Sequence, residues 1–192
     1  MRIGIFGGTF DPPHVGHLLV ASDAYEALAL DRLLFIPAGI QPFKIGVVQA
    51  SGAQRLAMLS LLIGDDPRFA VESIDTDRNG LSFTVDTLAA LAGRDPDATR
   101  FLLIGEDLAG QIASWREPAQ IARLAEIVVL ARPSRVAPSE GRTGELPMRR
   151  IETRRVEVSS SEIRERVRAG RAIRGFVPEA VAGFIATAGL YR

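Results

Sequence analysis

The N-terminal segment of this chain constrains its fold more than any other. Residues 5–17 read Ile-Phe-Gly-Gly-Thr-Phe-Asp-Pro-Pro-His-Val-Gly-His. The order predicts a strand from Arg2 to Phe6, a glycine turn and then a helix. Glycines lack a Cβ atom, so the backbone of such a turn can approach a ligand closely. We expect Asp11 to cap the helix and a proline to occupy its first position, where no N–H group is needed.

The start of this helix predicts a phosphate-binding site. Free backbone N–H groups and the positive end of the helix dipole favour an anion at a helix N-terminus. His14 and His17 are three residues apart, so their imidazoles are expected on one face of the helix, which Gly16 between them leaves open. A phosphate bound here would meet backbone donors on one side and two imidazoles on the other.

Other structures could carry the same residues. An ordinary strand–turn–helix with two surface histidines is one, because a glycine pair is a common turn signal. A zinc site would need a third ligand, and the chain has two histidines and no cysteine. A dinucleotide-binding turn needs Gly-x-Gly-x-x-Gly, and a Walker A loop needs Gly-Lys-Ser/Thr after the glycines; the segment has neither. A phosphate site of a different kind remains.

Length and composition predict one domain, residues 1–192, that binds neither nucleic acid nor membrane. The 192 residues are 47% hydrophobic and 24% charged, with a formal net charge of zero, so charge gives no reason to bind nucleic acid. No apolar run approaches the roughly 20 residues that span a bilayer, and we see no signal segment before the first strand. Without cysteine a disulfide framework is excluded, so we expect a cytoplasmic protein, which could form a homo-oligomer.

Apolar runs and amphipathic helical patterns alternate along the chain, which predicts an α/β fold. We expect a Rossmann-like, doubly wound parallel sheet with helices on both faces, followed by a small C-terminal helical portion over about 159–192. The Pro-, Ser- and Gly-rich stretch over about 134–149 predicts a mobile surface loop. The expected strands are 2–6, 33–36, 69–71, 100–104 and 126–130, and the expected helices include 18–30 and 54–63.

A second phosphate site is possible where a helix is predicted to begin near residue 160. Ser159 and Glu162 have the spacing of a capping box, which by itself explains a helix start. A helix start with hydroxyls and free amides can also bind phosphate. Arg164, one turn into the helix, could add a bidentate contact. The residues alone leave both interpretations open.

These two segments together resemble a known family. The string Gly-Gly-Thr-Phe-Asp-Pro-Pro-His-Val-Gly-His resembles the signature of nucleotidyltransferases with a His-x-Gly-His motif, in the version typical of bacterial nicotinate-nucleotide adenylyltransferases. Residues 159–164, Ser-Ser-Ser-Glu-Ile-Arg, resemble the Ser-Ser-Thr-x-Ile-Arg motif of that superfamily, with Ser161 in place of threonine. The segment from Gly189 to Tyr191 also matches the family, so the resemblance runs nearly end to end.

The resemblance implies an enzyme that transfers AMP from ATP to nicotinate mononucleotide, releasing pyrophosphate, in NAD biosynthesis. The implied catalytic residues are His14, His17, Lys44 and Arg164, with Lys44 against the mononucleotide phosphate. Mg²⁺ is expected to bridge the ATP phosphates, with few protein ligands and no dedicated metal site. The residues implied to bind ATP are Gly7, Gly8, Thr9, Phe10, His14, His17, Gly105, Asp107, Ser160, Ser161 and Arg164.

The resemblance also implies a mononucleotide site, formed by Lys44, Thr84, Trp115, Arg116 and Arg132. Thr84 and nearby amides would hold the nicotinate carboxylate at a helix N-terminus. Trp115 would stack on the pyridine ring, as aromatic pairs do.

Several of these residues also have a plain structural interpretation. Lys44 could be a solvated lysine, Trp115 a core residue and Asp107 the N-cap of the next helix, and either Ser82 or Thr84 could cap the helix near residue 84. Arg55, which fits the family's Arg-x-x-Met spacing with Met58, could be a surface arginine beside a core methionine. The chain also departs from the family twice, since Phe43 stands where a histidine is usual and Glu106 where a small residue is.

Three functions therefore need to be compared. The first is nicotinate-mononucleotide adenylyltransferase. The second is a sister transferase acting on nicotinamide mononucleotide, phosphopantetheine or glycerol phosphate. The third is a nucleotide-binding module without catalysis, which would bind ATP but release no pyrophosphate. The segments around Thr84 and Trp115 favour the first.

Overall fold

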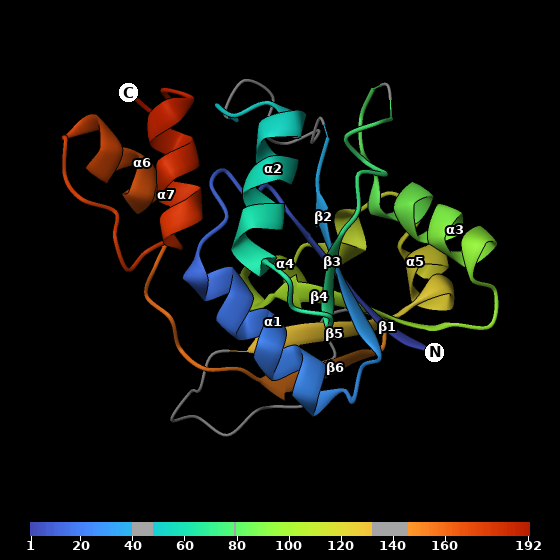
Figure 1. Cartoon of the computed structure of the whole chain (residues 1–192). Coiled ribbons are helices and arrows are strands. Elements are labelled where there is room, and N and C mark those ends of the chain that lie inside the picture. The colour runs from blue at the N-terminus through green and yellow to red at the C-terminus, as the bar shows by residue number, and fades with distance from the viewer. Residues whose placement is uncertain (40–47, 79, 132–145) are drawn as a thin grey trace.

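The computed structural model describes residues 1–39, 48–78, 80–131 and 146–192, in which helices lie between most of the strands and two helices follow the last strand (Figure 1). The strands are β1 (Arg2–Gly8), β2 (Arg32–Pro37), β3 (Phe69–Val71), β4 (Thr99–Gly105), β5 (Glu126–Ala131) and β6 (Met148–Glu152). The helices are α1 (Val15–Ala27), α2 (Gly52–Ile63), α3 (Thr84–Arg94), α4 (Glu106–Ala109), the 3₁₀ helix η1 (Ile112–Ser114), α5 (Pro118–Leu124), α6 (Ser160–Arg168) and α7 (Glu179–Thr187).

The strands form one sheet in the order β3-β2-β1-β4-β5-β6, and every neighbouring pair is parallel. The chain starts in the middle at β1, winds outwards to β3, and then returns to the other side of β1 for the remaining three strands. This doubly wound arrangement confirms the predicted fold class. The strand order reverses between β1 and β4, and ligands bind such sheets at the carboxyl ends of the strands at that point.

Alternate residues of the strands pack on opposite faces of the sheet. In β2, Leu33 and Phe35 belong to one apolar cluster, and Leu34 and Ile36 belong to the other. Helices α1, α2, α6 and α7 contribute to the first cluster, and α3 and α5 contribute to the second. Because both faces are covered, the central strands are continuous apolar runs, which is why the sequence predicts them well.

Strand β6, at the edge of the sheet, corrects one prediction. Residues 148 and 149 of the stretch that we expected to be a mobile loop, about 134–149, belong to β6, which starts at Met148 and pairs with β5 from Ile127 to Ala131. Ile151 is the one buried residue of this strand. An edge strand of this kind is held by its backbone hydrogen bonds and carries little apolar pattern of its own. Residues 134–145 of the predicted loop lie outside the described residues.

The C-terminal helices α6 and α7 lie beside α2, and α7 contacts α2 directly (Figure 1). Ile163 of α6 and Val181 and Ile185 of α7 are buried in the first apolar cluster. The C-terminal helical portion is thus confirmed, and it shares the core of the sheet. None of the helices in the described part of the chain is long and apolar enough to cross a membrane.

Candidate active site

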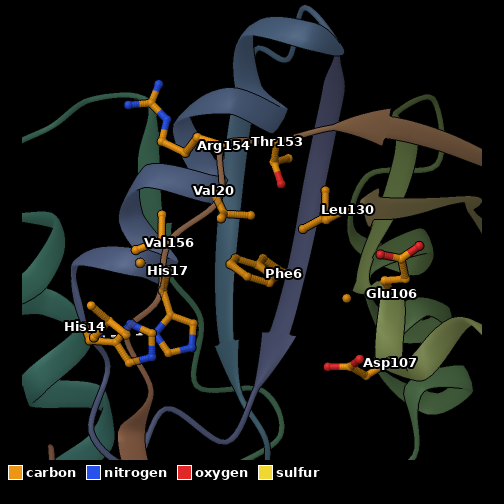
Figure 2. Close-up of a pocket in the computed structure, with 13 residues that line it drawn as sticks. Phe6, His14, His17, Val20, Glu106, Asp107, Leu130, Thr153, Arg154 and Val156 are labelled. Atoms are coloured by element: carbon orange, nitrogen blue, oxygen red, sulfur yellow. Dashed lines mark hydrogen bonds between the residues drawn. The ribbon is translucent and has the colours of Figure 1, made fainter. Parts of the chain in front are cut away.

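A pocket of about 260 Å³ opens at the carboxyl edge of the sheet, between β1 and β4. Figure 2 shows Phe6 of β1 at its centre, with the imidazoles of His14 and His17 on one side and the acidic side chains of Glu106 and Asp107 on the other. The pocket therefore lies at the point where the strand order reverses. The segment after β6 completes its wall with Thr153, Arg154, Val156 and Val158.

The two histidines occupy the start of α1 and contact each other. His14 is the N-cap residue, and its backbone N–H donates to Nδ1 of His17 at 3.2 Å, while the backbone N–H of His17 donates to the carbonyl of His14 at 2.9 Å. Their ring centroids are 3.7 Å apart. This corrects the prediction that Asp11 caps the helix, with a proline in its first position, which Val15 takes instead.

Burial keeps both imidazoles neutral at physiological pH. Burial lowers the pKa of His14 to about 4. Burial, followed by the proximity of His14, lowers the pKa of His17 well below its usual 6.5. Nδ1 of His14 is buried without a hydrogen-bond partner among the described residues. The pocket thus offers two neutral rings, each of which can donate one N–H to an anion.

The lowered pKa of His14 predicts that acid destabilises the protein. In the unfolded chain this imidazole gains a proton near pH 6.5, whereas in the folded chain it gains one only near pH 4. The free energy of unfolding therefore decreases as the pH falls from 6.5 to 4. Between pH 7 and pH 5 this loss amounts to about 2 kcal/mol for the one residue. Urea unfolding at both pH values should show that His14→Asn loses less stability than the parent by about this amount. Equal losses in the two proteins would contradict it.

A buried arginine holds the beginning of the turn that leads to the histidines. Arg55 of α2 is 4% exposed, and its Nη1 donates to the carbonyls of Thr9 at 2.9 Å and Ala38 at 2.7 Å. The surface-arginine interpretation of this residue is therefore wrong, whereas Met58 is a core residue as expected. Arg55 ties the loops that follow β1 and β2 together at the carboxyl edge of the sheet.

The second predicted helix start is bonded to the same turn. Nη1 of Arg164 donates to the carbonyl of Asp11 at 2.6 Å, and the hydroxyl of Ser160 donates to the carbonyl of Pro12 at 2.8 Å. Ser159 is the N-cap of α6 and accepts from the backbone N–H of Glu162 at 3.1 Å, which confirms the expected cap. The two candidate phosphate motifs therefore meet, through hydrogen bonds between residues that are 148 and 153 positions apart in sequence.

Arg164 also contacts the hydroxyl of Ser161, to which its Nη2 donates at 3.1 Å. These α6 residues are not among those that line the pocket. They lie against the turn that carries His14 and His17, so a ligand long enough to extend past the histidines could reach both helix starts.

Glycine is required at one of the two positions of the glycine pair. A Cβ atom added to Gly8 would lie 2.8 Å from Cζ of the Phe10 ring, whereas one added to Gly7 would meet nothing within 4 Å. We therefore expect Gly8→Ala to lower the free energy of unfolding by about 1–3 kcal/mol through overpacking. Gly7→Ala is the matched control for stability and should unfold at nearly the parental urea concentration. If Gly8→Ala were as stable as Gly7→Ala, the Phe10 ring would move aside without lowering the free energy of unfolding.

Gly105 and Asp107 lie at the end of β4 and both line the pocket. Gly105 is the N-cap of α4, and Asp107 lies within the first turn of that helix, so the interpretation of Asp107 as an N-cap is wrong. Glu106, the departure from the family pattern, forms an ion pair with Arg150 of β6. Asp107 has no ion-pair partner among the described residues, so its carboxylate is available to a ligand.

Three of the predicted mononucleotide residues lie in one region, outside the pocket. Thr84 is the first residue of α3, after the N-cap Phe83. The Arg116 guanidinium lies 4.9 Å from the centroid of the Phe83 ring and 3.7 Å from the Asp86 carboxylate. Trp115 is partly buried and packs, like Phe83, against the second apolar cluster. Lys44, Phe43 and Arg132 lie outside the described residues.

Most of the pocket wall was not predicted from the sequence, and its charged member Arg154 is the clearest example. Arg154 follows β6, and its guanidinium forms a bidentate pair with Asp23 of α1, with Nε 2.9 Å and Nη2 2.5 Å from Oδ1. Hydrogen bonding to Arg154 lowers the pKa of Asp23. The partners are 131 residues apart, so no local pattern could have paired them.

Comparison with known proteins identifies the family of this chain. The family model described as cytidylyltransferase-like matches residues 5–166. Two relatives, from Gemmatimonas aurantiaca and Thermus thermophilus, are both named "Probable nicotinate-nucleotide adenylyltransferase". They are 48% and 42% identical to this chain, and the matches span all of this chain and 93% and 100% of the two relatives. The solved nicotinic acid mononucleotide adenylyltransferase of Plasmodium falciparum, complexed with APC, shares the fold with a TM-score of 0.78 at 18% identity, over 99% of this chain and 96% of its own. The chain thus belongs to the nicotinate-nucleotide adenylyltransferases, within the cytidylyltransferase-like family.

Proposed function

We propose that this chain transfers AMP from ATP to nicotinate mononucleotide, giving nicotinate adenine dinucleotide and pyrophosphate. One observation carries the proposal: the start of α6, through Ser160 and Arg164, is hydrogen-bonded to the turn that leads into α1, beside a pocket at the β1/β4 junction. Helix starts favour anions, and two of them joined in this way suit a polyphosphate better than a single phosphate. The sequence relatives support the same reaction.

In this proposal ATP occupies the pocket with its triphosphate along the turn. His14 and His17 donate to the phosphates, and the carboxylate of Asp107 accepts from the ribose. Arg164 and the hydroxyls at the start of α6 hold the phosphates that leave. The remaining contacts come from Gly7, Gly8, Thr9, Phe10, Gly105, Ser160 and Ser161.

The mononucleotide is proposed to bind where α3 begins. Its nicotinate carboxylate would meet the helix start at Thr84, which favours a negative charge. Trp115 would stack on the pyridine ring, and Arg116 would add positive charge nearby. Lys44 and Arg132 remain proposals from the sequence for the phosphate of this substrate.

The reaction requires no general base from the protein. The attacking oxygen belongs to a phosphate monoester, whose second pKa is about 6, so it is already anionic at neutral pH. It forms a bond to the α-phosphorus of ATP while the bond to the β-phosphate oxygen breaks, and pyrophosphate carries away the charge. The side chains contribute by positioning the two anions in line and by donating hydrogen bonds to developing charge.

Mg²⁺ fits this site as an ion bound mainly by its substrate. Among the residues that the structure describes, no group of three or more His, Asp or Glu side chains could hold a metal. One carboxylate, that of Asp107, faces the pocket without an ion-pair partner in the described part of the chain. Mg²⁺ usually keeps several waters and binds through one or two carboxylates and phosphate oxygens. When bound it would neutralise part of the phosphate charge.

A substrate panel tests the proposed reaction. Pyrophosphate release is measured with ATP and, in turn, nicotinate mononucleotide, nicotinamide mononucleotide, phosphopantetheine and glycerol phosphate. We expect the highest kcat/KM with nicotinate mononucleotide. Preference for another acceptor would establish a sister transferase, and ATP binding without pyrophosphate release would establish a non-catalytic module.

A further inference from the structure

The carboxylate of Asp11, which does not cap α1, is instead bonded to a distant tyrosine. The hydroxyl of Tyr191 donates to Oδ1 of Asp11 at 2.7 Å, across 180 residues of sequence. The backbone N–H groups of Ala50 and Gln49 donate to the same carboxylate at 3.0 Å and 2.8 Å. Asp11 is 2% exposed and Tyr191 is 4% exposed. The carboxylate is therefore shielded from solvent and satisfied by protein donors.

The backbone at this contact is strained on both sides. Tyr191 has φ +64° and Phe10, directly before Asp11, has φ +51°. Residues with a Cβ atom rarely adopt this left-handed region, and they persist in it only where their surroundings hold them. Both side chains are buried in the first apolar cluster. The packing thus maintains two costly backbone conformations next to one hydrogen bond.

Asp11 is also the residue at which the two phosphate motifs meet. Its side chain accepts from Tyr191, and its backbone carbonyl accepts from Arg164 of α6. His14 follows three residues later at the start of α1. A shift of Asp11 would therefore move the histidines relative to Arg164. Burial, followed by the bond to Asp11, raises the pKa of Tyr191, so its hydroxyl stays protonated and remains a donor.

We infer that Tyr191 is a positioning residue for the reaction, because its hydroxyl fixes the Asp11 side chain and thereby the geometry between His14, His17 and Arg164. The inference rests on the proposed function, since it assigns the turn to ATP binding. Tyr191 does not line the pocket, and it acts on the substrate only through Asp11.

The test removes the hydroxyl and keeps the ring. Tyr191→Phe should lower kcat/KM for ATP about tenfold, as expected for one lost hydrogen bond to a buried charge. It should also shift the imidazole proton NMR signals of His14 and His17, which are the two histidines of the chain. Tyr25→Phe is the matched control, because Tyr25 is the only other tyrosine of the chain. It lies near the C-terminal end of α1, away from His14, where its ring packs against Phe69 of β3. The control should change neither measurement.

A double-mutant cycle with Asp11→Asn provides the second variant. If the two side chains act as one unit, the double variant should lose no more kcat/KM than the more damaging single variant. Urea unfolding confirms that each protein is folded at the assay temperature. Folded Tyr191→Phe protein with unchanged imidazole signals and unchanged kcat/KM would overturn the inference, as would fully additive losses in the cycle.

The two possible failures are distinguishable. If the parent protein does not turn over nicotinate mononucleotide, the proposed function is wrong, and the imidazole signals together with the affinity for a non-hydrolysable ATP analogue still test Tyr191. If the parent converts nicotinate mononucleotide but Tyr191→Phe matches Tyr25→Phe in kcat/KM and in the imidazole signals, the proposed function stands and the positioning role of Tyr191 is excluded.

Discussion

Replacing His17 with asparagine should lower kcat for AMP transfer by about 100- to 1,000-fold, the usual effect of removing one donor to developing charge. Nδ1 of His17 accepts from the backbone N–H of His14, and the side-chain oxygen of asparagine can take over this contact. The helix start should therefore survive while the ring nitrogen that faces the substrate is lost. The measurement is the rate of pyrophosphate release at saturating ATP and nicotinate mononucleotide.

The control for His17→Asn is Ser22→Ala on the same helix. The Ser22 hydroxyl donates to the carbonyl of Leu18 within α1 at 3.0 Å, so its removal perturbs the helix without touching the pocket. Ser22→Ala should retain parental kcat. A His17→Asn protein that is as active as the control would exclude the proposed role of the imidazole and favour a binding module.

Arg164→Met is expected to have the second largest effect, a loss of kcat/KM for ATP of about 100-fold. Two contributions add here, because the side chain both tethers Asp11 and, as proposed, contacts the leaving phosphates. Hydrogen bonds to charged groups contribute about 1.5–3 kcal/mol each, and about 2.7 kcal/mol corresponds to 100-fold. Initial rates at varied ATP concentration measure the loss.

Two further variants show whether the effect of Arg164→Met is specific to this guanidinium. Arg168→Met removes an exposed arginine from the last turn of the same helix and should leave kcat/KM unchanged. Arg164→Lys keeps the charge but loses the planar fork of the guanidinium, so it should recover part of the activity. If Arg164→Met loses stability but keeps its kcat/KM for ATP, the residue is only a structural tether.

The fold was predictable because its central strands are covered on both faces. Ile127 to Leu130 are buried without interruption, so an apolar run marked the strand directly. β6 was missed because only Ile151 is buried, and its place depends on backbone bonds to β5. Local apolar pattern thus predicts the interior of the sheet and fails at its edge.

The site was predictable where its chemistry is local. The pair of histidines and the Ser159 cap follow from spacing within one turn of helix. The prediction that Asp11 caps α1 is wrong, because its carboxylate accepts hydrogen bonds from Ala50 and Tyr191 instead of from the start of the helix. These donors are distant in sequence, so a local capping rule does not include them. Arg55 was underestimated for the same reason, since its carbonyl partner Thr9 lies 46 residues away.

The bond between Asp11 and Tyr191 has a consequence for synthesis of the protein. Translation delivers β1 first and residue 191 some 180 residues later, so a nascent chain can assemble most of its sheet while the turn at Asp11 still lacks its hydrogen bond from Tyr191. Enzymatic competence should then appear late and abruptly during elongation, after the hydrophobic framework has already formed.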